Sequence, residues 1–422
     1  MALRLTAEDE AMLAGDHGPG VAMAMRLVVA LARVSQATRL IDIESAHIDG
    51  CLYHGQAGLD FIERLVSLGA KVTVPTTLNV SSLDLLHPGL VRLDPTESAA
   101  ARRLMDAYVA IGARATWTCA PYQLAGRPEG GTDIAWAESN AIVFANSVLG
   151  ARTARYGDFV DVCAAVTGRA PLAGLHLAEN RIPTLELDCS SIPDHVLDSD
   201  AAWAALGFVV GREVGEQVSI LTGITPTVVD EDRLKALGAT SASSGGVALF
   251  HVAGVTPEAV DAGEAWPGAG LPRIEVTLEV LRTARDELTT ATVGDELNAV
   301  ALGTPHFSLA EFAKLAEALQ DGRPFDPSCT VWISTSREVL SKAREQGYAQ
   351  LCEAVGARLV VDTCTYLVPI LADSVRTAMT TSGKWAWYAP ANLGISVVLG
   401  TLAECIASAR AGRVIRNDSD WR

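Results

Sequence analysis

The sequence has no surplus of basic residues and no long hydrophobic run. Lys and Arg number 33 against 50 Asp and Glu, a formal net charge of −17 at pH 7. Because nucleic-acid binding needs cations to neutralise phosphates, this balance argues against a nucleic-acid partner. The most apolar segment, residues 22–34, is interrupted by Arg and falls short of the roughly 20 residues of a membrane span. Acidic residues near the N-terminus also argue against a secretory signal, so we expect a cytoplasmic protein without a membrane partner.

Several short motifs of well-known chemistry are missing. The chain has no GxxxxGK[ST] and no GxGxxG after a strand, which disfavours nucleotide chemistry. It has no GxSxG elbow, so Ser/His/Asp hydrolysis gains no support. The eight cysteines form no CxxC pair and are spread along the chain, so spacing alone predicts neither a disulfide framework nor a metal cluster.

Helical and extended patterns alternate along the 422 residues, and about half of these are apolar. Such alternation predicts an α/β fold of two or three units with largely parallel sheets flanked by helices. The predicted helices include residues 20–37, 59–68 and 336–355, and the predicted strands include 39–43, 71–75 and 359–361. Prolines and an acidic polar run in 183–200 favour a division into halves at 1–190 and 191–422.

Polar clusters accompany several predicted strands. Four follow a strand or a short extended piece, and a fifth precedes one: residues 45–50, 75–79, 116–122, 362–365 and 380–384. Ligands gather at the carboxyl ends of parallel strands, although Ser, Thr and Asn also simply form turns. Cys119 and Cys364 lie in two of these clusters, and their thiolates could ligate iron or be inert. Cys405 lies in a helix-like stretch, where the pattern alone favours core packing.

Candidate partners for a substrate carboxylate are the cations Arg152, Arg155 and Lys384. Solvated surface charge is an equally good interpretation of each. His47 lies in the first polar cluster, where it could be catalytic or a structural histidine.

The residues resemble the aconitase X family in one order over nearly the whole chain. The shared pieces are SAHIDG (45–50), VPTTLN (74–79), TCAPY (118–122), ANSVLGARTARYGD (145–158), TGRAPLAGLHLAENR (167–181), SSGGVALFHVAGVTPEA (243–259), GTPHFSLAE (303–311), VVDTC (360–364) and TSGKWAWYAP (381–390). The resemblance is to the large, catalytic subunit. It implies an aconitase-superfamily-like fold and a hydro-lyase with an iron–sulfur cluster.

The resemblance also implies a partner and a ligand set. Members need a small swivelling domain that carries a catalytic Ser, and we expect it as a separate chain that completes a heterodimer. Archaeal relatives carry Cys in a G-C-P-H motif where this chain has Gly303-Thr304-Pro305-His306. That difference favours a [2Fe–2S] cluster, for which the resemblance implies Cys119 and Cys364, with Cys405 as third candidate.

The implied reaction is dehydration of a small hydroxy acid, cis-3-hydroxy-L-proline, to a pyrroline-2-carboxylate. We assign catalytic roles to Lys384 and His47. Substrate binding is assigned to Gly50, Thr77, Asn79, Asn146, Ser147 and Arg152. Two alternatives stay open: the large subunit of a mevalonate 5-phosphate dehydratase, and a non-enzymatic α/β ligand-binding protein.

Overall fold

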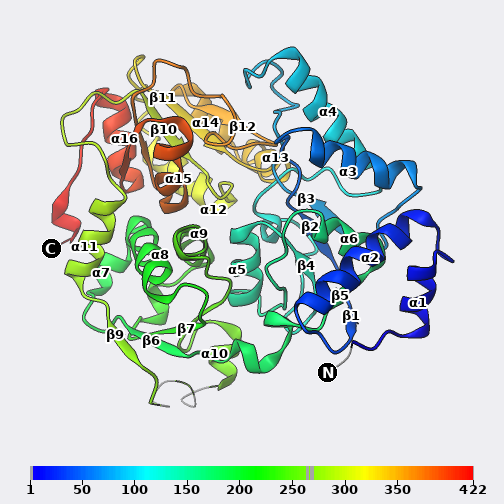
Figure 1. Cartoon of the computed structure of the whole chain (residues 1–422). Helices are drawn as coiled ribbons and strands as arrows, with labels where there is room; N and C mark the ends of the chain where they lie inside the picture. Colours follow the sequence, from blue (N-terminus) through cyan, green and yellow to red (C-terminus); the bar gives the residue numbers. More distant parts are fainter. Residues whose placement is uncertain (1–2, 263–265, 267–269, 422) are drawn as a thin grey trace. The chain divides into compact units, whose positions relative to one another are not determined.

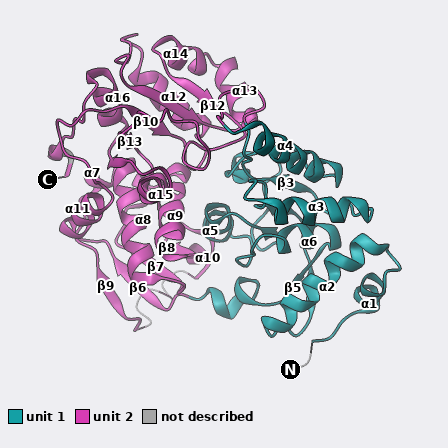
Figure 2. Ribbon diagram, turned by 45° about the horizontal axis from the view of Figure 1, so that its top comes forward, with its two compact units in different colours: residues 1–83, 93–182 teal, residues 84–92, 183–422 magenta. Residues whose placement is uncertain are grey.

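The computed structural model describes residues 3–262, 266 and 270–421, which form two compact units (Figure 2). Unit 1 is built from residues up to Leu83 and from Leu93–Ile182, and unit 2 from Asp84–Arg92 and from Pro183 onward. The short segment 84–92 belongs to unit 2 because its polar groups bond there. The Asp84 carboxylate accepts the Val361 N–H at 3.0 Å, and Arg92 donates to the Pro369 carbonyl at 3.3 Å.

Unit 1 contains a three-stranded parallel sheet in the order β3-β2-β4 and a short antiparallel pair, β1 with β5. Its strands are β1 (Leu40–Asp42), β2 (Ala46–Ile48), β3 (Thr76–Leu78), β4 (Ala135–Trp136) and β5 (Arg169–Pro171). Its helices are α1 (Ala7–Ala14), α2 (Pro19–Val34), α3 (Gln56–Ser67), α4 (Pro95–Ala110), α5 (Ser139–Ser147) and α6 (Val160–Thr167), with 3₁₀ turns η1 (Pro121–Gln123), η2 (Gly174–His176) and η3 (Ala178–Arg181). In the sheet, His47 lies opposite Thr77 on one side and Trp136 on the other.

Unit 2 contains two parallel sheets, a four-stranded one in the order β8-β7-β6-β9 and a five-stranded one in the order β12-β11-β10-β13-β14 (Figure 1). The strands are β6 (Leu185–Asp188), β7 (Ser219–Thr222), β8 (Phe250–Val252), β9 (Arg273–Glu275), β10 (Ala299–Leu302), β11 (Thr330–Ser334), β12 (Arg358–Val360), β13 (Thr377–Thr380) and β14 (Ser396–Leu399). The helices are α7 (Asp194–Leu197), α8 (Asp200–Val214), α9 (Glu231–Gly245), α10 (Pro257–Ala262), α11 (Leu278–Glu287), α12 (Leu309–Ala318), α13 (Arg337–Glu345), α14 (Tyr348–Ala354), α15 (Gly383–Leu393) and α16 (Leu402–Ala411), with 3₁₀ turns η4 (Pro226–Val228) and η6 (Asp418–Trp421).

Helices α8 and α9 run side by side beside the four-stranded sheet, and glycines let them approach closely (Figure 1). A Cβ atom added to Gly245 of α9 would lie 1.7 Å from the Gly211 carbonyl oxygen of α8. Any larger residue at Gly245 would therefore force the two helices apart. The five-stranded sheet has its own hydrophobic core, to which strand, α12 and α16 side chains contribute, Val300, Phe312 and Ile406 among them.

The predicted fold class is confirmed, since three of the four sheets are parallel and helices flank them. The strand predicted at 71–75 is wrong, because β3 covers Thr76–Leu78. The Val72 and Thr73 N–H groups bond instead to the carbonyls of Ile111 and Ala165. No helix in the described part of the chain is both long and apolar enough to cross a membrane.

Two other local predictions are also wrong. The helix predicted at 336–355 is two helices, because Gly347 between them adopts a left-handed φ of 79°. Residues 380–384 do not open a strand but join β13 to α15, where the Ser382 hydroxyl caps the helix by accepting the Trp385 N–H at 3.0 Å.

Candidate active site

The carboxyl edge of the unit 1 sheet carries a polar cluster. Asp49 follows β2, Asn79 follows β3, and Glu138 lies just beyond β4. Neighbouring parallel strands end at the same edge of a sheet, so residues far apart in the sequence meet there. This edge holds four of the predicted site residues: His47, Gly50, Thr77 and Asn79.

His47 is buried in β2 and held by its neighbour in the sheet. Its Nδ1 lies 2.8 Å from the Thr77 hydroxyl oxygen. Burial lowers the pKa of His47 to about 3, so the imidazole is neutral at physiological pH. The other ring nitrogen, Nε2, is buried and has no hydrogen-bond partner in the described part of the chain. The structure therefore brings His47 and Thr77 together and leaves one imidazole nitrogen for a further group.

Two carboxyl groups lie beside this histidine strand. The Asp49 N–H donates to the Asp161 carboxylate at 2.7 Å, and the Asn79 amide donates to the Asp49 carboxylate. Burial, then the negative charges of Glu138, Asp158 and Asp161, raise the pKa of Asp49 to about 7. Burial likewise raises the pKa of Asp161 to about 7. Both groups therefore titrate near neutrality, which is typical of functional sites.

A second hydrogen-bond array links Glu138 to the Cys119 loop. Glu138 has a left-handed φ of 73°, which costs of order 1–3 kcal/mol in a residue with a side chain. Its carboxylate caps α5 by accepting the Ala141 N–H at 2.9 Å and also bonds to the Asn140 amide. Asn140 in turn donates to the Cys119 carbonyl at 2.9 Å and accepts from the Tyr122 hydroxyl at 2.6 Å. The array fixes the backbone that presents Cys119, which is buried.

The remaining predicted residues of unit 1 lie in and after α5. Asn146 bonds through its side chain to both backbone groups of Thr153 at 3.0 Å, and it accepts from Arg181 at 3.0 Å. These contacts give Asn146 a structural role. Ser147 is buried at the end of α5, and Arg152 is half-buried, with no hydrogen-bond partner for its Nε among the described residues. Substrate binding by these three residues stays a prediction.

In unit 2 the carboxyl edge of the five-stranded sheet brings His306 and Cys364 together. His306 follows β10, Cys364 follows β12, and their ligand atoms lie within 4.8 Å of one another. Both side chains are buried. Imidazole nitrogen and thiolate sulfur are ligands that iron accepts in proteins.

His306 is oriented as metal-binding histidines usually are. Its Nε2 lies 3.2 Å from the Thr363 carbonyl oxygen, which can only accept, so Nε2 carries the hydrogen and Nδ1 carries the lone pair. Burial lowers the pKa of His306 to about 4, and the charges of Lys235 and Lys384 add to this effect. The ring is therefore neutral at physiological pH, the form that binds metals. Lys384 itself is buried at the start of α15.

Cys405, the third predicted ligand, lies on α16 in the hydrophobic core of the five-stranded sheet. Burial raises the pKa of its thiol well above the ordinary value, which disfavours the thiolate that a metal needs. Its predicted ligand role stays a prediction, and its surroundings favour packing.

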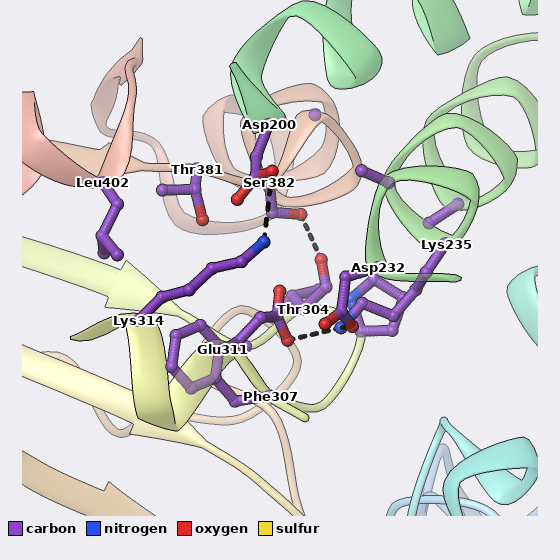
Figure 3. A pocket seen from close by; sticks show the side chains of 15 residues that line it. Asp200, Asp232, Lys235, Thr304, Phe307, Glu311, Lys314, Thr381, Ser382 and Leu402 are labelled. Carbon is purple, nitrogen blue, oxygen red and sulfur yellow. Dashed lines mark hydrogen bonds and ion pairs between the residues drawn. The ribbon is translucent and has the colours of Figure 1, made fainter. Parts of the chain in front are cut away.

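A small charged cavity of about 40 Å³ lies beside the same sheet edge (Figure 3). Lys235 Nζ lies 2.9 Å from the Asp232 carboxylate and contacts Glu311, while Lys314 points toward Asp200 at 3.8 Å. Burial acts to lower the pKa of Lys235, but the two carboxylates outweigh it and hold the pKa above its usual value. The cavity is therefore lined by a buried lysine that is paired with two carboxylates.

Sequence reasoning missed four of these residues: Asp49, Glu138, Lys235 and, as a ligand candidate, His306. Asp49 and His306 stood within the quoted motifs at strand ends, so their positions were available as a signal. Glu138 and Lys235 carried no such signal, because their roles depend on partners distant in the sequence.

Parallel sheets whose carboxyl edges hold buried imidazole, thiol and lysine groups define an α/β protein with a candidate site for a soft metal. Three family profiles match the chain: the aconitase X first domain at residues 2–179, the second domain at 178–286 and the third domain at 297–411. The chain belongs to the aconitase X family. The predicted halves, 1–190 and 191–422, stay a prediction.

Individual relatives agree with this assignment. The chain is 45% identical to the cis-3-hydroxy-L-proline dehydratase of Pseudomonas aeruginosa, over 97% of this chain and 70% of that protein. It is 38% identical to the phosphomevalonate dehydratase large subunit of Methanothermobacter thermautotrophicus, over 92% and 94%. The crystal structure of Thermococcus kodakaraensis aconitase X (holo-form) matches with a TM-score of 0.86 and 34% identity, over 96% and 100% of the two chains. The predicted enzyme class, a hydro-lyase, is confirmed by these relatives.

Proposed function

We propose that this chain is the large subunit of an iron–sulfur-dependent dehydratase that converts cis-3-hydroxy-L-proline to a pyrroline-2-carboxylate. The observation that carries the proposal is the buried His306–Cys364 pair, whose ligand atoms lie within 4.8 Å at the carboxyl edge of a sheet of the aconitase X fold. The substrate is proposed from the 45% identity to the Pseudomonas aeruginosa enzyme.

The donor set fits an iron–sulfur cluster. His306 offers a neutral imidazole and Cys364 a thiol, and both are shielded from water. We include Cys119 as the thiol from unit 1, because Asn140 and Glu138 hold its backbone in a defined place. Cys405 remains the weaker candidate. A small [2Fe–2S] cluster agrees with Thr304 in place of the archaeal Cys. Iron would supply Lewis acidity at the leaving hydroxyl group.

The chain's own residues would bind and orient the substrate. The reaction breaks the Cα–H bond and the C3–O bond, and the enamine product tautomerises to the pyrroline. Lys384 is proposed to pair with the substrate carboxylate, and His47 to contact the substrate through Nε2. Thr77 holds the His47 ring, and Gly50 lets the backbone pass close to the Tyr108 hydroxyl, from which a Cβ at Gly50 would lie only 3.0 Å away.

A small partner subunit completes the proposal. The name of the Methanothermobacter relative, a large subunit, implies such a partner for that enzyme. For this chain we propose a small swivelling domain whose Ser acts as base, in a cytoplasmic heterodimer. The non-enzymatic alternative is set aside, because the relatives are dehydratases. Mevalonate 5-phosphate remains the alternative substrate.

The test combines metal analysis with a two-substrate assay. Protein purified anaerobically with a co-expressed small subunit is expected to contain iron and acid-labile sulfide and to dehydrate cis-3-hydroxy-L-proline. Protein free of iron and sulfide, even after reconstitution, would contradict the cofactor. Turnover of mevalonate 5-phosphate with none of hydroxyproline would contradict the substrate but leave the cofactor standing.

A further inference from the structure

The orientation of the Asn79 amide is set by its neighbour Asp49. The amide nitrogen of Asn79 donates to the Asp49 carboxyl group. The amide oxygen, Oδ1, is left as the acceptor of this side chain. Asn79 is 3% exposed, and its Oδ1 is buried without a donor among the residues that the structure describes. Buried acceptors without a donor are unfavourable, so this oxygen is suited to a ligand that brings an N–H or O–H group.

The charges that raise the pKa of Asp49, the neighbour of this oxygen, are all negative. Asp49 interacts with the negative groups Glu138, Asp158 and Asp161. Asp161 is occupied by the chain, since its carboxylate accepts the N–H groups of Asp49 and Val162, both at 2.7 Å. Asp49 is half-buried, and so less enclosed than Asn79. The local potential favours a cation and repels phosphate or carboxylate.

His47 adds a second unsatisfied atom on the same sheet. The residue is fully buried, and no described residue forms a hydrogen bond with its Nε2. Because the pKa of His47 is lowered to about 3 by burial, the ring adds no positive charge that could attract an anion. His47 lies in β2, and Asn79 directly follows β3, the neighbouring parallel strand.

We propose that Asp49 and Asn79 Oδ1 bind the ring ammonium of a cyclic amino acid, and that this contact selects the substrate. A secondary ammonium carries one positive charge and two N–H donors, one for each of these two acceptors. Mevalonate 5-phosphate has no such group and would place its negative charges elsewhere. The inference rests on the proposed function for its substrate class. Within it, Asn79 is the residue that touches the substrate amine, together with Asp49.

The test measures binding instead of turnover. Isothermal titration of the iron-loaded protein with its small subunit compares L-proline with (S)-tetrahydrofuran-2-carboxylate, which has oxygen in place of the ring nitrogen. Because charged hydrogen bonds are the strong ones, we expect L-proline to bind about 10- to 100-fold more tightly. Equal affinities, or no binding of L-proline, would overturn the proposal.

Two variants test whether Asp49 and Asn79 cause the preference for L-proline over the oxygen analogue. Asp49→Asn and Asn79→Leu are each expected to weaken L-proline binding by about tenfold or more while changing binding of the oxygen analogue little. Asp60→Asn is the matched control, since Asp60 is an exposed acid on α3 of the same unit. A purely structural role would weaken both ligands alike and overturn the proposal. The wild-type comparison decides the question even where a variant does not fold.

The result is separable from the proposed function. A protein that prefers L-proline over its oxygen analogue but dehydrates no hydroxyproline keeps the ammonium site and loses the proposed reaction. A protein that dehydrates hydroxyproline while binding both analogues equally keeps the reaction and loses the site. Binding of sodium or potassium ions that L-proline does not displace would also overturn the inference.

Discussion

The three-stranded sheet of unit 1 and the five-stranded sheet of unit 2 both carry polar side chains at their carboxyl edges, but the chemistry of these side chains differs. In unit 1 the edge of β3-β2-β4 ends in oxygen groups, Asp49, Asn79 and Glu138. In unit 2 the edge of the five-stranded sheet brings together a nitrogen and a sulfur ligand, His306 and Cys364, and the charge of the buried Lys384 acts on the pKa of His306. Oxygen groups of one sign suit a cationic organic ligand, whereas imidazole and thiol suit iron. The fold thus provides equivalent positions, and side-chain type decides what each can bind.

The largest expected effect comes from removing the Cys364 thiol, the proposed sulfur ligand of unit 2. Cys364→Ser is expected to abolish bound iron and detectable dehydration, because serine is a poor ligand for iron–sulfur clusters. Cys405→Ser is the matched control, since Cys405 packs in a hydrophobic core. Iron-to-protein ratio and visible absorption after anaerobic purification are the measurements. Iron loss in the Cys405 variant and retention in the Cys364 variant would reverse the assignment.

The charge balance of the two units gives a second test. In unit 2 the buried Lys235 neutralises Asp232 and Glu311, whereas the charges that act on Asp49 in unit 1 are acids. Lys235→Met leaves two carboxylates uncompensated and is expected to lower the free energy of unfolding by about 3–5 kcal/mol.

Lys342→Met supplies the control, because Lys342 pairs with Glu338 at 2.9 Å on an exposed surface. It should change stability by less than about 1 kcal/mol in urea unfolding at pH 7.5. Similar losses of unfolding free energy in the two variants would mean that burial does not make the Lys235 ion pairs more important for stability than an exposed pair.

The smallest expected effect tests whether the acidic surroundings of Asp49 in unit 1 raise its pKa. The pKa of Asp49 is raised from 3.8 to about 7, so its stabilising contribution is present at low pH and is lost as pH rises through 7. The Asp49→Asn variant has no ionisable group at this position, so it does not lose stability there as the pH rises. The variant should therefore gain about 2–3 kcal/mol relative to wild type between pH 5 and pH 8.

Urea unfolding of wild type and variant at both pH values measures this gain. Asp60→Asn should show the same difference from wild type at both pH values. A gain that is absent, or that grows toward low pH, would contradict a raised pKa for Asp49.

The fold class was predictable because the alternation of helical and extended patterns along the chain depends on residues that are close in sequence. Local detail failed where distant groups intervened. The backbone of 71–75 bonds to the ends of helices and not to a strand, and Gly347 divides a helix that periodicity alone had joined. For the candidate site, position at strand ends marked His47, Thr77, Asn79 and Cys364. The same reasoning offered Cys405, which the structure places in a core, and passed over His306 as a ligand.

By itself the sequence determined that the chain is an acidic α/β protein with polar clusters at strand ends and cysteines outside any short motif. Only the tertiary structure decided which of these clusters meet. Strand order is set by pairing between distant segments, so β12 and β10 each neighbour β11 and bring Cys364 to His306. Burial then decided the charge states of His47, His306 and Asp49, because desolvation depends on everything packed around a group and not on its neighbours in sequence.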